Sequence, residues 1–441
     1  MLELNGINVI SEEERHGTPR NLFWPWMAGN VSLLALSYGS FFLGYGISFW
    51  QATAAAILGT VGSFALVAIS SLAGKKSNAP TMTLSRAIFG VKGNIVPGFL
   101  SYLIFVGWET VLVSLATLAT GTVFTEFGHI NKNLAELIGF IFAAGLTIVS
   151  GVLGFKLIMK IQRWITIATL VLSVGYVLLT LNKINWSAVK SLSNGNGTGF
   201  IGALIFGVIG IGLGWVNSAA DYSRYLPRNS SSRAVIGWTI FGASIVPILM
   251  VIYGSLLAAS SKSLNDAIGA DPIGALTTLL PKWYLIPFAL VAILGLIGGS
   301  ILDLYSSGIA LVSIGLPVKR HIAASIDGGI MTIGTIYIVW IANSFIGPFQ
   351  SFLITLGVPV AVWSAMFVAD VISRRSYNEA ALFDKNGEYG SWNFKSLGLL
   401  AIGSIIGWSF VSKSIGNIGI IYALVIGFVG QLILAKKKPR K

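Results

Sequence analysis

The sequence predicts an all-α polytopic membrane protein with 12 transmembrane helices. Only 10% of its 441 residues are charged, whereas about 25% is usual in a soluble domain. Hydrophobic residues make up 54% of the chain, and long stretches such as 21–74 and 328–369 contain no charge at all. Both stretches exceed the roughly 20 residues that an apolar helix needs to cross a bilayer. These observations exclude an ordinary soluble protein.

Charges, Gly/Pro clusters and polar runs divide the chain into the expected spans. The first span stays in the mature protein, because Glu12, Glu13 and Glu14 precede it and its apolar stretch is too long for a cleaved signal peptide. The twelve spans are expected at residues 22–49, 52–73, 97–125, 134–154, 161–182, 200–219, 235–258, 284–315, 326–342, 347–370, 396–412 and 416–435.

The distribution of basic residues predicts the orientation. The chain has 29 Lys and Arg against 16 Asp and Glu, for a net charge of +13. If both termini are cytoplasmic, 23 of the 29 basic residues fall on the cytoplasmic side, where membrane proteins carry their excess of Lys and Arg. We therefore expect a multi-pass protein of the cell (plasma) membrane with both termini cytoplasmic. The charge then needs no nucleic-acid partner, and the absence of cysteine excludes disulfides and thiolate metal sites.

Two glycine-rich segments predict interrupted helices. One lies in span 1 and the other in span 6, at corresponding positions five helices apart. Non-helical backbone in a bilayer is tolerated only where it is buried in protein or lines a cavity, and paired interruptions are typical of secondary transporters. Alternatively, these glycines only let neighbouring helices pack closely. The residues singled out are Gly29, Asn30 and Ser32 in span 1, and Gly212, Trp215 and Asn217 in span 6.

Two carboxylates lie inside expected spans, Glu109 in span 3 and Asp303 in span 8, again five helices apart. A charge at the centre of a membrane helix costs on the order of 3 kcal/mol, so such residues usually face a cavity and carry function. A low dielectric favours the neutral carboxyl, which makes both residues candidate proton carriers. A hydrogen-bonded structural carboxyl is the alternative. Other acids, including Asp327, fall near expected span ends and are expected to pair with loop bases or with head-group water.

Trp108 and Trp215 lie deep in spans 3 and 6, beside Glu109 and the second glycine cluster. Stacking an indole on a planar ligand contributes about 1–3 kcal/mol, which suits a heterocyclic base. Packing of buried tryptophans is the equally weighted alternative.

Five motifs, in this order, resemble the purine–cytosine permease branch of the nucleobase:cation symporter family. The similarity runs from about Leu22 to the last span. The motifs are S-R-A-I-F-G-V-K-G-N at 85–94, V-G-W-E-T at 106–110, W-V-N-S-A-A-D-Y-S-R-Y-L-P at 215–227, D-L-Y-S-S-G at 303–308 and V-A-D-V-I-S-R-R-S-Y at 368–377.

The resemblance implies a leucine-transporter-like fold of two inverted five-helix repeats plus two peripheral helices. It implies a secondary active transporter, not an enzyme, that works by alternating access, and we expect a monomer in the lipid bilayer. The expected division is a cytoplasmic tail at 1–21, the first repeat at 22–182, the second repeat at 183–370, a cytoplasmic loop with peripheral spans 11 and 12 at 371–435, and a basic cytoplasmic tail at 436–441.

The resemblance also implies a substrate site in which a nucleobase, cytosine or a purine, stacks between Trp108 and Trp215. Asp303 replaces an Asn of the fungal carriers, and an ionised Asp can accept from two adjacent N–H groups, which favours an amino-bearing base. Leu112 stands where relatives often place a polar amide. The expected substrate-binding residues are Gly29, Asn30, Ser32, Trp108, Glu109, Gly212, Trp215, Asn217 and Asp303.

No cofactor is expected beyond a coupling ion. In sodium-coupled relatives the cation lies between spans 1 and 8, and here that weak site would consist of Gly29, Ser32, Gly295, Gly298 and Gly299. Glycines supply carbonyls but no hydroxyls, so the site is poor in oxygen unless Ser300 or Ser32 compensates. Proton symport through Glu109 or Asp303 is therefore favoured over sodium. Lys156 and Lys160 are rival charge carriers, but they are better explained as loop bases.

Three alternatives remain. The same fold could carry a related heterocycle (allantoin, hydantoin or a thiamine pyrimidine precursor) with sodium coupling. A membrane enzyme is disfavoured because His16, His129 and His321 are scattered and no nucleophile has a recognisable partner. A channel is disfavoured because no filter motif is repeated in the chain.

Overall fold

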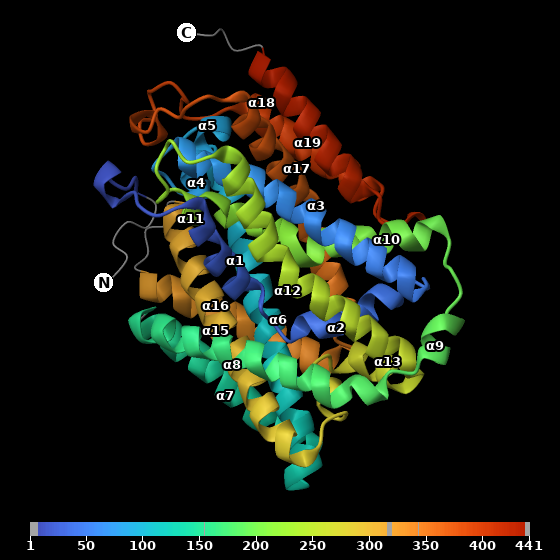
Figure 1. Cartoon of the computed structure of the whole chain (residues 1–441). Helices are drawn as coiled ribbons and strands as arrows, with labels where there is room; N and C mark the ends of the chain where they lie inside the picture. Colours follow the sequence, from blue (N-terminus) through green and yellow to red (C-terminus); the bar gives the residue numbers. More distant parts are fainter. Residues whose placement is uncertain (1–7, 154, 315–319, 343, 437–441) are drawn as a thin grey trace.

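The computed structural model describes residues 8–153, 155–314, 320–342 and 344–436, and this part of the chain is helical and contains no strand (Figure 1). Ten of its helices are long and apolar enough to cross a membrane. They are α3 (Phe49–Lys76), α6 (Ile95–Gly128), α7 (Lys132–Leu153), α8 (Phe155–Thr180), the helix from α10 (Gly197–Gly207) to α11 (Ala219–Ser223), α12 (Ser232–Ser260), α15 (Lys282–Ser313), α16 (Arg320–Ile336), α17 (Ile346–Ser373) and α19 (Gly419–Lys436).

The first span is broken, as predicted. It consists of α1 (Phe23–Asn30) and α2 (Leu34–Leu43), whose axes differ in direction by 71°. The bent pair adds an eleventh candidate span. The sixth span departs from α-helix without such a bend. A π-helical turn (Val208–Gly212) and a 3-10 segment (Leu213–Ser218) connect α10 to α11, so the α-helical hydrogen-bond ladder is interrupted where the glycines cluster.

A shorter apolar helix, α18 (Phe394–Ser409), packs against α17 and α19. It has 16 residues, so the expected total of twelve spans stays a prediction. The shorter elements are α4 (Thr81–Leu84), α5 (Arg86–Phe89), α9 (Trp186–Ser191), α13 (Lys262–Ala270), α14 (Gly274–Thr277) and the 3-10 turns Glu12–Glu14, Pro19–Leu22, Leu181–Lys183, Ala380–Leu382 and Lys413–Ile415.

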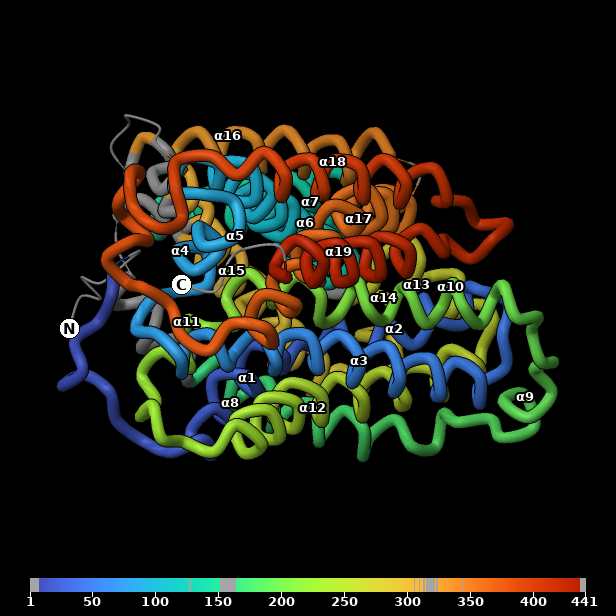
Figure 2. The backbone as a smooth tube through the Cα atoms, turned by 90° about the horizontal axis from the view of Figure 1, so that it is seen from above, coloured from blue at the N-terminus to red at the C-terminus, as the bar shows by residue number. Residues whose placement is uncertain are grey.

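The long helices run between two ends of the molecule. Figure 2 shows the first described residues, in dark blue, at the left and α9 at the right. We call the end that holds residues 8–20, α4, α5 and the loop after α17 the terminal side, and the opposite end the far side. The predicted basic tail at 436–441 lies outside the described residues except for Lys436.

Glycines allow the backbones of α2 and α12 to touch. A Cβ built on Gly254 of α12 would lie 1.8 Å from the carbonyl oxygen of Leu36, and one built on Gly39 of α2 would lie 2.1 Å from the backbone nitrogen of Ser255. Neither position has room for a methyl group. Close backbone approach at small residues is how membrane helices pack firmly without a hydrophobic driving force between them.

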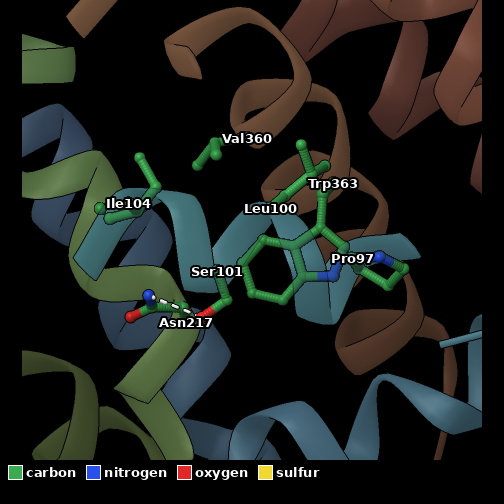
Figure 3. A pocket seen from close by; sticks show the side chains of 8 residues that line it. Pro97, Leu100, Ser101, Ile104, Asn217, Val360 and Trp363 are labelled. Atoms are coloured by element: carbon green, nitrogen blue, oxygen red, sulfur yellow. Dashed lines mark hydrogen bonds between the residues drawn. The ribbon is translucent and has the colours of Figure 1, made fainter. Parts of the chain in front are cut away.

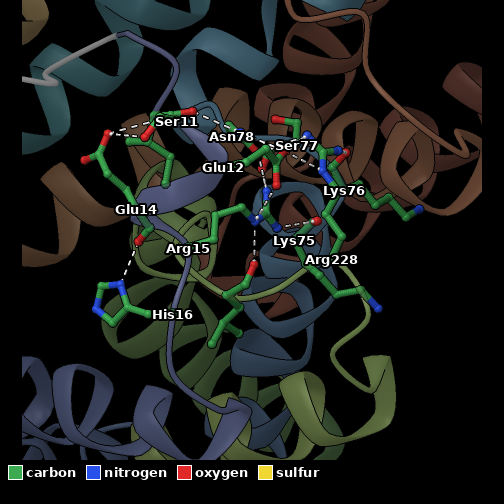
Figure 4. Close-up of polar contacts among 12 residues, drawn as sticks. Ser11, Glu12, Glu14, Arg15, His16, Lys75, Lys76, Ser77, Asn78 and Arg228 are labelled. Carbon is green, nitrogen blue, oxygen red and sulfur yellow. Dashed lines mark hydrogen bonds and ion pairs between the residues drawn. The ribbon is translucent and has the colours of Figure 1, made fainter.

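On the terminal side, two arginines tie the N-terminal segment to the bundle (Figure 4). The side chain of Arg15 is 2% exposed and donates to the carbonyls of Leu226 and Lys75 at 2.8 Å. Arg228 binds Glu12 at 2.6 Å and Glu379 at 2.9 Å. The segment before α1 is thereby docked against the loops that follow α3, α11 and α17.

Candidate functional site

The two tryptophans predicted to bind the substrate come from the third and sixth spans. Trp108 lies on α6, and Trp215 lies in the 3-10 segment of the sixth span. A Cβ built on Gly214, the residue before Trp215, would lie 3.8 Å from Trp108 Nε1, so the Trp108 indole lies against the backbone of the sixth span. Trp108 also packs edge-on against Phe349 and Phe352 of α17, with ring centroids 5.8 and 6.1 Å apart. Trp108 thus lies against the sixth span and α17, and its role as a stacking platform stays a prediction.

The break in span 1 lies against the same place. A Cβ built on Gly29 would lie 3.3 Å from the ring of Trp215, and Trp26 meets that ring edge-on at 6.0 Å. Asn30 is buried and donates to the carbonyl of Trp26 at 2.8 Å, so its amide N–H stabilises the end of α1. Ser32 accepts from the backbone N–H two residues later at 3.3 Å.

Gly212 has a packing role. A Cβ there would lie 2.2 Å from Ser63 Oγ of α3. The position faces the second span, so any contact with a substrate would come from its backbone.

Two carboxyls from different halves of the chain lie on the adjacent helices α6 and α15. Glu109 follows Trp108 on α6 and is fully buried, and neither of its carboxyl oxygens has a hydrogen-bond partner among the described residues. Asp303, on the adjacent helix α15, is partly buried and within electrostatic range of Glu109. An unpaired carboxylate in an apolar interior is unfavourable, so this environment favours a protonated Glu109.

On the terminal side of the tryptophans, Asn217 donates from Nδ2 to Ser101 Oγ of α6 at 3.1 Å. Figure 3 shows this pair beside the ring of Trp363, which lines the same cavity. The cavity has room for about one water molecule. Its lining residues are Pro97, Leu100, Ser101, Ile104, Gly214, Asn217, Val360 and Trp363. Asn217 thus joins the sixth span to the third at this cavity.

Aromatic rings close the far side. Tyr38 of α2 packs against Phe206 of α10 at 5.5 Å and Phe349 of α17 at 6.0 Å, and its hydroxyl donates to the carbonyl of Gly210 at 3.0 Å. The loop around α13 covers α2, where Ser40 Oγ donates to Asn265 at 2.7 Å. A substrate from the far side would have to separate these contacts.

The residues predicted to form the weak cation site have different neighbours in the structure. Ser300 is hydrogen-bonded to Thr147 of α7 at 2.6 Å and to the carbonyl of Ile297 at 2.9 Å, so its hydroxyl is engaged by α7 and by its own helix. A Cβ on Gly299 would meet Leu112 at 3.0 Å, and one on Gly295 would lie 3.7 Å from Ile165. Gly298 is buried.

The rival lysines cannot be placed at the site. Lys156 and Lys160 belong to α8, but their side chains fall outside the described part of the chain.

Asp327 lies near the start of its candidate span (Ala324–Ile341), as predicted, but its partners among the described residues are not loop bases. Helix α16 begins at Arg320, which places Asp327 two turns inside it, and the residue is 0% exposed. Its partners are Tyr102 and Ser307. The sequence shows an acid at the start of an apolar stretch, but it does not show which residues bind that carboxyl.

Known proteins resemble the chain over its whole length. The profile of a family described as "Permease for cytosine/purines, uracil, thiamine, allantoin" matches residues 9–433. The "Putative purine-cytosine permease YxlA" of Bacillus subtilis (strain 168) is 24% identical, over 100% of this chain and 97% of the relative. The purine-cytosine permease FCY2 of Saccharomyces cerevisiae is 20% identical, over 98% of this chain and 81% of that protein.

Solved structures show the same fold. The inward-facing conformation of Mhp1 superposes with a TM-score of 0.78 at 18% identity, over 100% of this chain and 95% of Mhp1. A closed conformation of Mhp1, a nucleobase-cation-symport-1 family transporter, superposes with a TM-score of 0.71 over 99% and 97% of the two chains. The predicted leucine-transporter-like fold is confirmed. The chain belongs to the family of permeases for cytosine/purines, uracil, thiamine and allantoin.

Proposed function

We propose that the protein imports a nucleobase, cytosine or a purine, by proton symport. The observation that carries this proposal is the contact of the Trp108 indole with the backbone of the sixth span at Gly214, the residue before Trp215, together with the buried Glu109 next to Trp108 in the chain. Two indoles that can separate around a planar ring provide stacking, and a neighbouring carboxyl provides a hydrogen-bonding edge. The names of the relatives support a base as the substrate.

Asp303 sets the preferred hydrogen-bond pattern in this proposal. An ionised Asp accepts from two adjacent N–H groups, such as a ring N–H and an exocyclic amine. We therefore expect amino-bearing bases to be preferred over bases that present a carbonyl at that edge. The Asp303→Asn variant should therefore show a smaller difference in uptake between amino-bearing and carbonyl-bearing bases.

Proton coupling is favoured over sodium coupling by the surroundings of the candidate groups. Glu109 has no hydrogen-bond partner among the described residues, whereas the hydroxyl of Ser300 is committed to α7 and leaves the weak cation site poor in oxygen. An inside-negative potential contributes about 2.3 kcal/mol per charge per 100 mV, enough to concentrate a neutral base.

Alternating access requires two sets of contacts to open in turn. On the far side these are the rings around Tyr38, and on the terminal side they are the Asn217–Ser101 hydrogen bond and the docked N-terminal segment. We propose that spans 1, 2, 6 and 7 rock as a bundle against spans 3, 4, 8 and 9. Proton and base enter from the far side and leave on the terminal side.

We further propose that the terminal side is cytoplasmic, that the protein is a monomer of the cell membrane, and that the repeats divide near residues 182 and 370. The chain has no cysteine, so single cysteines can report its topology. A cysteine at Ser11 should react with a membrane-impermeant reagent only after cells are permeabilised, and one at Ser263 should react in intact cells.

Transport by purified protein in liposomes tests the function. Labelled cytosine and hypoxanthine would be offered under a pH gradient alone and under a sodium gradient alone. We expect accumulation with the pH gradient and none with sodium. Accumulation that follows the sodium gradient and does not respond to the pH gradient would show sodium coupling instead of proton coupling. Competition by allantoin, hydantoin and thiamine pyrimidines would identify a related heterocycle as the substrate.

A further inference from the structure

A third carboxyl, Asp327, lies inside the bundle and has no part in the mechanism above. It is 0% exposed. The hydroxyl of Tyr102 on α6 donates to its Oδ1 at 2.7 Å, and the hydroxyl of Ser307 on α15 donates to its Oδ2 at 2.8 Å. Both partners are buried, at 4% and 0% exposure. One carboxyl of α16 is thus held by two other helices of the bundle.

This cluster lies in line with the two carboxyls of the site. Tyr102 precedes Glu109 by seven residues, which is two turns along one face of α6 and about 10 Å toward the terminal side. Ser307 follows Asp303 by four residues, about 6 Å along α15 in the same direction. Glu109 is also within electrostatic range of Asp327. The cluster is therefore the next polar position between the site and the terminal side along these two helices.

The hydrogen bonds at Asp327 accommodate both protonation states. An ionised Asp327 accepts from Tyr102 and Ser307. A protonated Asp327 can donate to Ser307 Oγ, because Ser307 can turn its own hydrogen to the carbonyl of Leu304, 3.0 Å away. Neither state leaves a buried polar group without a partner. Glu109, by contrast, has no such partners among the described residues.

Among the side chains that the structure describes, few titratable groups lie near this carboxyl. The titratable groups that face Asp327 are Tyr102 and Glu109 from α6, and Asp303 lies one turn beyond Ser307 on α15. On α7, the charged groups of the described residues, Lys132 and Glu136, lie near the far side. Asp327 forms no ion pair within the described part of the chain.

We propose that Asp327 is the release site for the coupling proton. This proposal rests on the proton symport proposed above. After the base has left, the O–H bond of the Glu109 carboxyl breaks, and the proton passes through the Tyr102 hydroxyl and intervening water. A new O–H bond forms on the Asp327 carboxylate, and the negative charge moves to Glu109. Asp327 then gives the proton to water on the terminal side.

The Asp327→Asn variant separates release from the other steps. Net uptake driven by a pH gradient requires deprotonation on the terminal side, whereas exchange of labelled for unlabelled base across the membrane does not. We expect D327N in liposomes to lose at least tenfold in net uptake and to keep exchange within twofold of the unaltered protein. Ser307→Ala, which removes one partner in each protonation state, should reduce net uptake severalfold. Asp266→Asn, at an exposed acid, should change neither.

The outcomes are distinct. Unchanged net uptake by D327N, with pH-driven uptake intact in the unaltered protein, would overturn the release site alone. Loss of both exchange and net uptake by D327N, at normal amounts in the membrane, would show a structural role and also overturn it. If uptake by the unaltered protein does not respond to the pH gradient, both the proton symport and the release site are contradicted.

Discussion

Asn217 and Ser101 form a hydrogen bond of 3.1 Å between the sixth span and α6, on the terminal side of the two tryptophans. In the proposed mechanism, the two groups of helices that this bond joins move apart when the site opens toward the terminal side. It lies beside a cavity that Ile104 also lines. It is therefore placed to hold this side closed.

Ser101→Ala should make the terminal side open more often. A hydrogen bond contributes about 0.5–1.5 kcal/mol net, so its loss should raise the open population by roughly twofold to tenfold. A cysteine at Ile104, in this cysteine-free chain, reports the opening through its rate of reaction with a thiol reagent in inverted vesicles. The same cysteine combined with Ser409→Ala, an exposed serine of α18, is the control. Equal reaction rates in the Ser101→Ala and Ser409→Ala backgrounds would show that the Asn217–Ser101 bond does not hold the terminal side closed.

Trp108→Ala should weaken the binding of the base. Stacking contributes about 1–3 kcal/mol per base, so the KM for uptake should rise roughly fivefold to 150-fold. Trp108→Phe keeps a ring and should lose less. Uptake is measured in cells at matched amounts of protein in the membrane, with Trp186→Ala on α9, 53% exposed, as the control. A normal KM for the alanine variant would remove Trp108 from the substrate site.

The broad fold was predictable because its causes are local. Apolar length and the absence of charge fix where helices can cross a bilayer, and the glycines of spans 1 and 6 marked both departures from α-helix. The form of each departure was not predictable. Span 1 bends by 71°, whereas span 6 stays continuous through a π-helical turn, since the course of each backbone depends on the helices packed against it.

The site was only partly predictable for a related reason. Trp108, Glu109 and Trp215 stood out because large or charged groups are unusual at membrane depth. The direction of a hydroxyl is a tertiary property, so nothing in the sequence showed that Ser300 turns to α7. Asp327 was missed because its partner Tyr102 is 225 residues away, and only the packing of α6 on α16 reveals the pair.

Gly254→Ala should destabilise the folded protein. A methyl group there would meet the Leu36 carbonyl at 1.8 Å, and forced overpacking typically costs about 1–3 kcal/mol. We expect a fall of several degrees in the Tm of the detergent-solubilised protein. Gly237→Ala on the same helix has nothing within 4 Å of the new Cβ and should leave the Tm nearly unchanged. Equal Tm values for the two variants would show that α2 and α12 can move apart without penalty.

Docking of the N-terminal segment should weaken in acid. The hydrogen bond from Arg228 lowers the pKa of Glu12 below its ordinary value of 4.5. The bond therefore contributes fully above pH 4.5 and is lost as the pH falls through the lowered pKa. Hydrogen exchange of residues 9–18, corrected for intrinsic rates, should rise only a few-fold, because Glu12 is 60% exposed and exposed pairs contribute little. Glu12→Gln should remove this pH dependence, whereas Lys262→Gln, in an exposed pair on the far side, should preserve it. Retention of the pH dependence in E12Q would assign it to another group.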